Sequence, residues 1–255
     1  NGIIKANVSL TNVGLLNIPT TGKLTIGARA DGASAWFNGL IDRVTIWKDS
    51  SSQIDNTFVM NQYLNEMAPI PPPPVTDPSK IFHATFNEAS GQFKDIGPYA
   101  LHSSSVVNVD YGLSSIIPGK GGLAVGFNAK PNNGQVNFPN TGKVLSPQCP
   151  FYVSAWVKRL GSSPYGVQII SGVYDFGPNK AWVMYLYDTS PVETLFFVDL
   201  SLGGGDDLFS TLALINYNDG NSHHTAFYFD SVLGYLKLFV DGVQTTGTFS
   251  GPAAT

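Results

Sequence analysis

The sequence predicts an all-β protein, and three observations support that prediction. Charged residues make up only 13% of the 255 residues, whereas about a quarter is usual in soluble domains. Glycine and proline are frequent, with 27 and 17 copies, and they divide the chain into short stretches. Most of these stretches alternate apolar and polar residues or are rich in β-branched and aromatic residues, as strands are. Many short strands separated by turns indicate an antiparallel β-sandwich or jelly roll.

The expected strands follow one another along the chain with turn residues between them. The pattern predicts strands over residues 3–10, 23–28, 40–47, 81–86, 104–109, 123–127, 135–138, 151–160, 167–175, 181–188, 194–200 and 208–216. Residues 223–242 predict a β-hairpin with a turn at 230–234, followed by a second tight turn at Asp241-Gly242. Residues 49–64 differ, because their apolar residues are spaced near a helical period after a Ser- and Asp-rich start. We expect one short helix there.

Residues 68–79 mark a boundary. They contain six prolines, at positions 69, 71, 72, 73, 74 and 78, a density that excludes a helix and favours polyproline II. Ten residues in that conformation span roughly 30 Å at about 3.1 Å each, so the segment is a stiff spacer. We therefore expect two units, residues 1–67 and 80–255, joined by a proline-rich linker.

Three runs of the sequence resemble laminin-G-like domains, the jelly rolls of the concanavalin A-like lectin and glucanase family. They are HHTAFYFDSVLGYLKLFVDG at 223–242, PFYVSAWVK at 150–158 and WFNGLIDRVTIW at 36–47. In that family a run like 36–47 follows the hairpin, whereas here it precedes it. The resemblance implies that 1–67 is the closing part of one sandwich and that 80–255 is the opening part of a second, without its closing strands.

Three arrangements are compatible with that order. The chain is an excerpt of a tandem array, or a unit that completes itself or a neighbour by strand donation, or a natural circular permutant. The stiff linker would have to return residue 80 to a sheet that 1–67 already occupies. We therefore expect residues 40–47 to pair outside 80–255 of the same chain, with the two segments in different sandwiches.

Composition excludes several classes of function. The formal net charge is −4 and no run of Lys or Arg occurs, which argues against nucleic acid or an anionic membrane surface as a partner. No apolar run reaches the roughly 18–20 residues that span a bilayer, so membrane insertion is not expected. Cys149 is the only cysteine, which excludes an internal disulfide, and we expect it to pack as a small apolar group.

The sequence contains no recognisable catalytic constellation. Glycosidases of the family that the chain resembles carry three acids on one strand, Glu-x-Asp-x-x-Glu, so that all of them face the sugar. This sequence has only three glutamates, Glu66, Glu88 and Glu193, and no two acids are separated by a single residue. His223 and His224 are neighbours on a predicted strand and point to opposite faces, so they cannot bind one metal together. The protein is therefore not expected to be an enzyme.

The resemblance implies two kinds of binding site. Many laminin-G-like domains hold a structural Ca²⁺ with loop carboxylates, and Asp42 and Asp95 lie at matching positions of the closing and opening motifs. The alternative is that both accept backbone hydrogen bonds in turns; Asp206 and Asp207 are a second loop candidate. Sugar binding needs exposed aromatic side chains, for which packing in the core is the alternative. The candidates are Trp36, Tyr165, Tyr174 and Trp182, whereas Trp47 and Trp156 are expected in the core.

The expected function is a non-enzymatic structural or adhesive repeat of an extracellular surface protein or filament, at the cell or virion surface. Its expected partners are neighbouring copies or repeats of itself. The alternative is a glycan-binding, lectin-like module of a secreted or viral protein. Asn7-Val8-Ser9 matches the N-glycosylation pattern, in keeping with an extracellular location.

Overall fold

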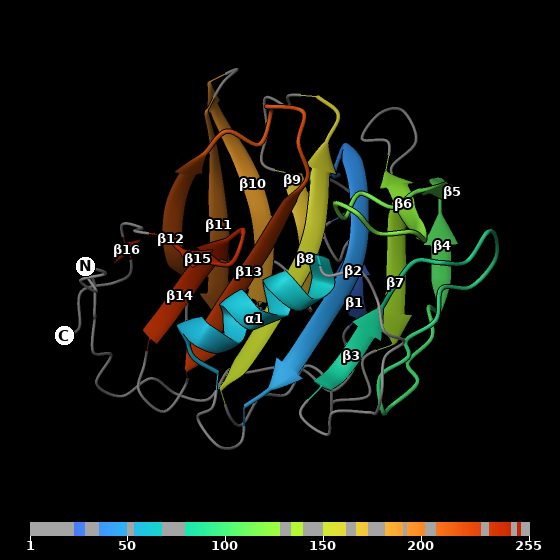
Figure 1. The fold of residues 1–255 in the computed structure, drawn as a ribbon, viewed down its shortest axis with the longest axis horizontal. Helices are drawn as coiled ribbons and strands as arrows, with labels where there is room; N and C mark the ends of the chain where they lie inside the picture. The colour runs from blue at the N-terminus through green and yellow to red at the C-terminus, as the bar shows by residue number, and fades with distance from the viewer. Residues whose placement is uncertain are drawn as a thin grey trace.

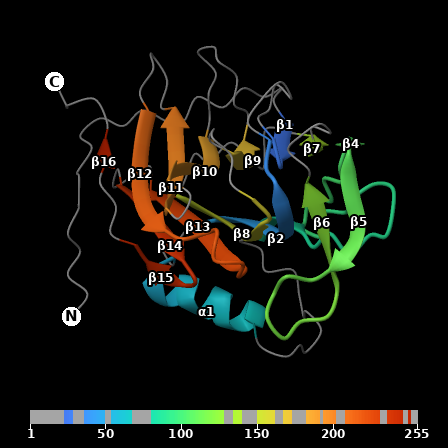
Figure 2. The same ribbon diagram turned by 90° about the horizontal axis from the view of Figure 1, so that it is seen from above.

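A computed structural model describes residues 23–28, 36–49, 54–67, 80–127, 134–139, 150–161, 167–172, 182–190, 193–201, 208–230, 235–245 and 249–250. These residues form two antiparallel sheets that pack face to face, and a helix lies on the outer face of one of them (Figure 1). Seen from above, the three layers are sheet A, sheet B and the helix (Figure 2). The predicted all-β sandwich is confirmed.

Each sheet is built from strands that are distant in the sequence. Sheet A has the order β16 (Phe249–Ser250), β12 (Leu208–Ile215), β11 (Glu193–Ser201), β10 (Trp182–Ser190), β9 (Val167–Gly172), β1 (Lys23–Ile26), β7 (Gln135–Pro139) and β4 (Ser105–Val107). Sheet B has the order β15 (Val243–Gln244), β14 (Tyr235–Val240), β13 (His223–Asp230), β8 (Phe151–Arg159), β2 (Gly39–Lys48), β6 (Leu123–Phe127) and β5 (Val109–Ser114), and β3 (Lys80–Ala84) also pairs with β2.

The two N-terminal strands of the described chain lie inside the sheets, not at their edges. β1 pairs with β7 on one side and β9 on the other, and β2 pairs with β8 on one side and with β6 and β3 on the other. Segments 1–67 and 80–255 therefore build the same two sheets, and the expectation that they belong to different sandwiches is corrected. The reason is physical: β1 and β2 need neighbours on both edges, and the later strands leave one gap in each sheet. Residues 68–79, which connect the two segments, lie outside the described residues.

The core between the sheets contains the inward-facing side chains of both. Leu24 and Ile26 of β1 and Ile41, Val44 and Ile46 of β2 are all at most 2% exposed and belong to this core. They pack with aromatic side chains from the later strands. The described N-terminal segment is thus part of the hydrophobic core that stabilises the whole sandwich.

The predicted helix is confirmed, although it begins and ends later than expected. Helix α1 spans Asn56–Met67, and Asp55 caps it by accepting the N–H of Phe58 at 2.8 Å. Val59 is its only buried residue, so the helix is held mainly by partly buried side chains. In the part of the chain that the structure describes, no helix is long and apolar enough to span a membrane.

Strands β5 and β16 were not predicted. The pattern over 104–109 indicated a single strand, whereas β4 belongs to sheet A and β5 to sheet B, with Asn108 between them at φ = 48°. Asparagine tolerates this left-handed conformation better than most residues. The chain therefore crosses from one sheet to the other at this edge of the sandwich (Figure 1).

Candidate functional site

Several ionisable groups lie on the outer face of sheet B, where α1 packs. Asp42 on β2 lies opposite Trp156 on β8, and Trp156 lies opposite His224 on β13. These three side chains, called here the helix-covered row, are 2%, 1% and 0% exposed. They reach the outer face because side chains alternate along a strand and their neighbours Ile41 and Val157 point into the core.

Helix α1 places two side chains over the helix-covered row. Trp156 Nε1 donates a hydrogen bond to Glu66 Oε2 at 2.6 Å, and the same oxygen lies 3.8 Å from His224 Nε2. Tyr63 stacks on Trp156 with ring centres 5.7 Å apart and an interplanar angle of 21°. Tyr63 and Glu66 are three residues apart, so they share one side of the helix. The result is an aromatic and carboxylate cluster from four elements.

Gly242 allows α1 to lie close to the sheet. A Cβ at Gly242 would lie 2.9 Å from Tyr63 Cδ1 and 3.0 Å from Met60 Sδ, and the residue has φ = 76°. Asn56 at the start of the helix also donates from its side-chain amide to Gln244 Oε1 at 2.9 Å. The predicted second tight turn at Asp241-Gly242 is confirmed, because β14 and β15 pair across it.

Burial shifts the pKa values of the cluster in opposite directions. It raises the pKa of Glu66 to about 7, and the hydrogen bond from Trp156 offsets this only in part. Burial also raises the pKa of Asp42 to about 6, against a hydrogen bond from Ser115 Oγ at 2.6 Å. His224 is affected the other way, because burial lowers its pKa to about 4, and neither of its ring nitrogens has a hydrogen-bond partner. Near neutral pH the histidine is therefore neutral.

A carboxyl group with a pKa near 7 is the kind of group that general acid catalysis uses. Here, however, the Glu66 carboxyl lies between its own helix and the sheet. The Glu66 side chain is 13% exposed and the His224 side chain 0%. The carboxyl contacts the Trp156 indole rather than an open cleft. No sequence signal marks this cluster, because the direction of the helix and the register of the strands bring Glu66 to it.

Replacing Glu66 with glutamine is expected to make the stability of the protein less dependent on pH. The pKa of Glu66 rises from 4.5 to about 7 on folding, so the folded state keeps a proton that the unfolded chain loses between these values. The contribution of Glu66 to the free energy of unfolding of the wild-type protein therefore falls as pH rises from about 4.5 to about 7. The amide mimics the protonated acid, so E66Q should gain on the order of 2 kcal/mol relative to wild type between pH 4.5 and pH 8.

Urea unfolding followed by tryptophan fluorescence measures this difference. Comparing the two proteins at each pH removes the contributions of His83 and His224, which titrate in both; the charge of Asp42 acts on Glu66 and is part of the measured difference. A constant difference in unfolding free energy from pH 4.5 to pH 8 would show that Glu66 is not a buried acid.

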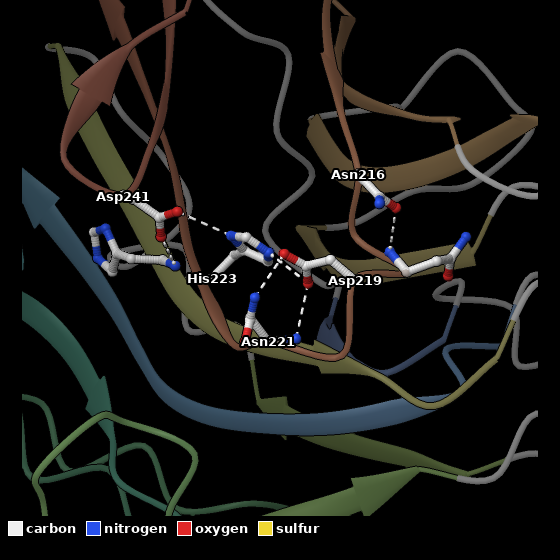
Figure 3. A network of polar contacts seen from close by, with 7 residues as sticks. Asn216, Asp219, Asn221, His223 and Asp241 are labelled. Carbon is white, nitrogen blue, oxygen red and sulfur yellow. Dashed lines mark hydrogen bonds and ion pairs between the residues drawn. The ribbon is translucent and has the colours of Figure 1, made fainter.

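His223, the neighbour of His224 in the sequence, belongs to a different network (Figure 3). His223 Nδ1 lies 2.9 Å from Asp241 Oδ2 and its Nε2 lies 3.3 Å from Asp219 Oδ1, while Asp241 Oδ1 accepts the N–H of His224 at 2.9 Å (Figure 3). The hydrogen bond with Asp241 is the main cause that raises the pKa of His223. The network ties the turn before β13 to the turn after β14, and its stabilising effect is lost as pH rises through that raised pKa. The prediction that the adjacent histidines point to opposite faces is confirmed.

The two predicted calcium ligands have separate environments. Asp95 is 1% exposed and accepts the backbone N–H groups of His83, Gly97 and Leu101 at 2.8, 2.8 and 2.9 Å. Asp42 belongs to the helix-covered row instead. The turn-acceptor alternative thus accounts for Asp95, and the described residues contain no group of three or more His, Cys, Asp or Glu that could hold a metal. The Ca²⁺ site remains a prediction.

The four predicted sugar-binding aromatics have different outcomes. The prediction for Trp182 is wrong, because the side chain is 1% exposed and lies in the core between the sheets. Its ring centre lies 5.5 Å from that of Phe227, so no sugar can stack on it. Trp36 is half-buried just before β2. Tyr165 and Tyr174 lie outside the described residues, as do Asn7, Cys149, Asp206 and Asp207.

The two tryptophans expected to be buried, Trp47 and Trp156, are buried, but beneath α1 rather than between the sheets. Trp47 packs edge-on against Phe58 of the helix, with ring centres 5.2 Å apart. Alternation along a strand could not distinguish these positions, because both faces of sheet B are covered where the helix lies.

No family model, curated protein or solved structure matches the chain. The likeness to laminin-G-like domains therefore rests on the three sequence runs alone. These runs lie on β14, β13, β8 and β2, which are neighbours in sheet B. Function has to be argued from the chemistry of the side chains.

Proposed function

We propose that the protein is a non-enzymatic structural or adhesive module of an extracellular surface protein or filament. One observation supports this most: Asp95, His223 and Glu66 are engaged with other protein groups. The carboxylate of Asp95 accepts backbone N–H groups in a turn, and His223 bridges two carboxylates. Glu66, on the sheet-facing side of α1, accepts a hydrogen bond from the Trp156 indole. A hydrolase needs such groups free to reach a substrate.

The architecture supports the same proposal. A sandwich of two sheets with a continuous core is a rigid body that suits load-bearing or display. The resemblance to laminin-G-like domains favours a location at the cell or virion surface. Neighbouring copies of the chain are the proposed partners.

The absence of glycosidase activity is the first expected result. Incubation with α- and β-glucans should release no reducing sugar, because Asp42 and Glu66, the two acids with raised pKa values, are only 2% and 13% exposed. The Glu66→Gln variant is the matched control. Turnover that survives purification and is lost in this variant would overturn the non-enzymatic assignment.

Self-association of the purified chain is the second expected result. Sedimentation velocity over a series of concentrations should show reversible assembly of the purified chain, and surfaces coated with it should capture further copies. A protein that stays monomeric and captures nothing at every concentration would contradict the proposed adhesive role.

Glycan binding is the second candidate, and one feature favours it. Trp36 is half-buried at the end of the sandwich where Leu160 is 58% exposed, and the Leu160 N–H donates to the carbonyl of Asn38 at 3.2 Å. A partly exposed aromatic ring is where a sugar can stack. On a glycan array, binding that is lost in Trp36→Ala and kept in the buried control Trp182→Phe would support this candidate over the first.

A further inference from the structure

We propose that His223 is a pH-sensitive clamp, which holds the loop of residues 216–222 closed while its imidazole carries two protons and releases the loop when one is lost. The loop connects β12 of sheet A to β13 of sheet B and carries Tyr217 and Asp219. The inference goes beyond the proposed adhesive role and does not depend on it.

The geometry of the clamp requires a charged imidazole. Nδ1 of His223 lies 2.9 Å from Asp241 Oδ2 and Nε2 lies 3.3 Å from Asp219 Oδ1, so each ring nitrogen faces a carboxylate oxygen (Figure 3). An ionised carboxylate only accepts hydrogen bonds, and a neutral imidazole has one N–H, whereas the imidazolium has two. Both contacts are therefore hydrogen bonds only while both ring nitrogens of His223 are protonated.

Loss of one proton breaks the contact with Asp219 rather than the contact with Asp241. The Asp241 contact is the shorter one, and Asp241 is also held by β13: its Oδ1 accepts the N–H of His224, and its own N–H donates to the carbonyl of His224. The Asp219 carboxylate is held within its own loop, because it accepts the backbone and side-chain N–H groups of Asn221, both at 2.8 Å. The lone pair of a deprotonated Nε2 then faces Asp219 Oδ1, which drives the loop away from His223.

Tyr217 makes the closed loop costly. Its side chain is 1% exposed, and its hydroxyl has no hydrogen-bond partner among the described residues. Burial raises the pKa of Tyr217 well above its usual range, so the phenol is uncharged. A buried hydroxyl without a partner destabilises the closed state, whereas water satisfies it when the loop opens. Burial of the ring and the charged clamp offset this cost, so loss of the charge on His223 shifts the balance toward opening.

The groups around His223 favour its charged form. The hydrogen bond with Asp241 is the main cause that raises the pKa of His223, and Asp219 acts in the same direction. Partial burial acts to raise the pKa of Asp219, but hydrogen bonds, among them the one from His223, outweigh it and lower the pKa. Asp219 therefore stays ionised while His223 titrates. Of the neighbouring strands, β8 places Val157 opposite His223, and β13 adds His224, which is neutral because burial lowers its pKa to about 4.

Opening of the loop is expected to increase with pH. The imidazole of a released His223 has its ordinary pKa of 6.5, whereas the pKa in the clamp is raised. Closure of the loop therefore binds a proton and is most favoured below pH 6.5. Between pH 6.5 and the raised pKa, the equilibrium constant for opening should rise by roughly tenfold per pH unit at most, and above that pKa it should stay constant.

NMR of the native protein tests the proposal. With tyrosine rings labelled with carbon-13, the relaxation caused by a soluble paramagnetic agent reports the exposure of Tyr217, and Tyr217→Phe identifies the signal. The ring proton of His223 gives the pKa of that histidine in the same samples. Exposure of Tyr217 should rise severalfold with pH, and the rise should lie between pH 6.5 and the measured pKa.

Two variants separate the clamp from other effects of pH. His223→Gln cannot carry the charge that both carboxylates need, so Tyr217 should be exposed at every pH as it is in the wild type at high pH. Asp219→Asn keeps the turn within the loop, because an amide oxygen still accepts the N–H of Asn221. It removes the ionised partner of Nε2, so most of the rise with pH should be lost. The matched control His102→Gln removes a histidine outside the network and should keep the wild-type profile.

Three results would overturn the clamp. The first is an exposure of Tyr217 that stays constant while His223 titrates, and the second is a His223 pKa at or below 6.5. The third is a rise with pH that persists in either clamp variant or disappears in the His102→Gln control. If His223→Gln does not fold, Asp219→Asn gives the same test. None of these results depends on self-association, which is measured separately.

Discussion

Replacing Asp95 with alanine is expected to destabilise the folded protein by roughly 4 kcal/mol. The side chain is 1% exposed and its two oxygens accept three backbone N–H groups, from His83, Gly97 and Leu101. Alanine leaves these donors without partners in a region closed to water, and each buried unpaired donor costs about 1–3 kcal/mol. The loss should shift the urea midpoint strongly without changing the slope.

The matched control is Asp55→Ala at the start of α1. Asp55 also accepts a backbone N–H, from Phe58 at 2.8 Å, but that bond is exposed to solvent. Removing an exposed cap typically costs about 1 kcal/mol. Equilibrium unfolding of both variants gives the comparison, and a D95A protein no less stable than D55A would show that the Asp95 carboxylate does not hold its turn.

Replacing Gly27 with alanine is expected to cost about 3 kcal/mol or more, from a clash added to backbone strain. Gly27 has φ = 83°, and a Cβ there would lie 2.1 Å from Cδ1 of Phe127, which is itself 1% exposed. Neither the Gly27 backbone nor the Phe127 ring can move freely. Gly27 donates its N–H to the carbonyl of Ile169 at 2.9 Å, and the ring lies in the core.

Gly119→Ala separates the two causes. Gly119 has a similar φ of 72°, but a Cβ there would meet no atom within 4 Å, so only strain on the order of 1 kcal/mol is expected. Thermal and urea unfolding of both variants measure the difference. Equal destabilisation would mean that Gly27 does not face Phe127, and so that the segment carrying β1 does not pack in this sandwich.

The elements of the fold could largely be predicted from local pattern. Alternation and turn residues located the strands within a few residues, and the period of residues 49–64 located α1, since both signals come from neighbours in sequence. The crossing at Asn108 could not be found, because a left-handed residue other than glycine has no reliable sequence signal.

The partners of the strands could not be derived in the same way. The prolines of 68–79 predicted a boundary between two units, but they carry no information about which strands lie beside β1 and β2. Pairing between residues as distant as Thr45 and Ser154 depends on the shape of the gap left by all the other strands. The family order of motifs favoured separate sandwiches, and the register contradicts it.

The candidate site was the hardest part to predict. The raised pKa of Glu66 depends on a helix crossing three strands, and nothing near Glu66 in sequence marks it as buried. Trp36 and Trp182 have similar local sequence settings, yet one is half-buried at an end of the sandwich and the other lies in the core. Which face of a strand is covered is a property of the assembled layers.

Hydrogen–deuterium exchange of the native protein tests most directly whether residues 23–67 share one sandwich with residues 80–250. The amides of β2 should be protected as strongly as those of β8, and both should exchange in one cooperative step, because the strands pair over most of their length. Rapid exchange of β2 amides while β8 stays protected would contradict the account.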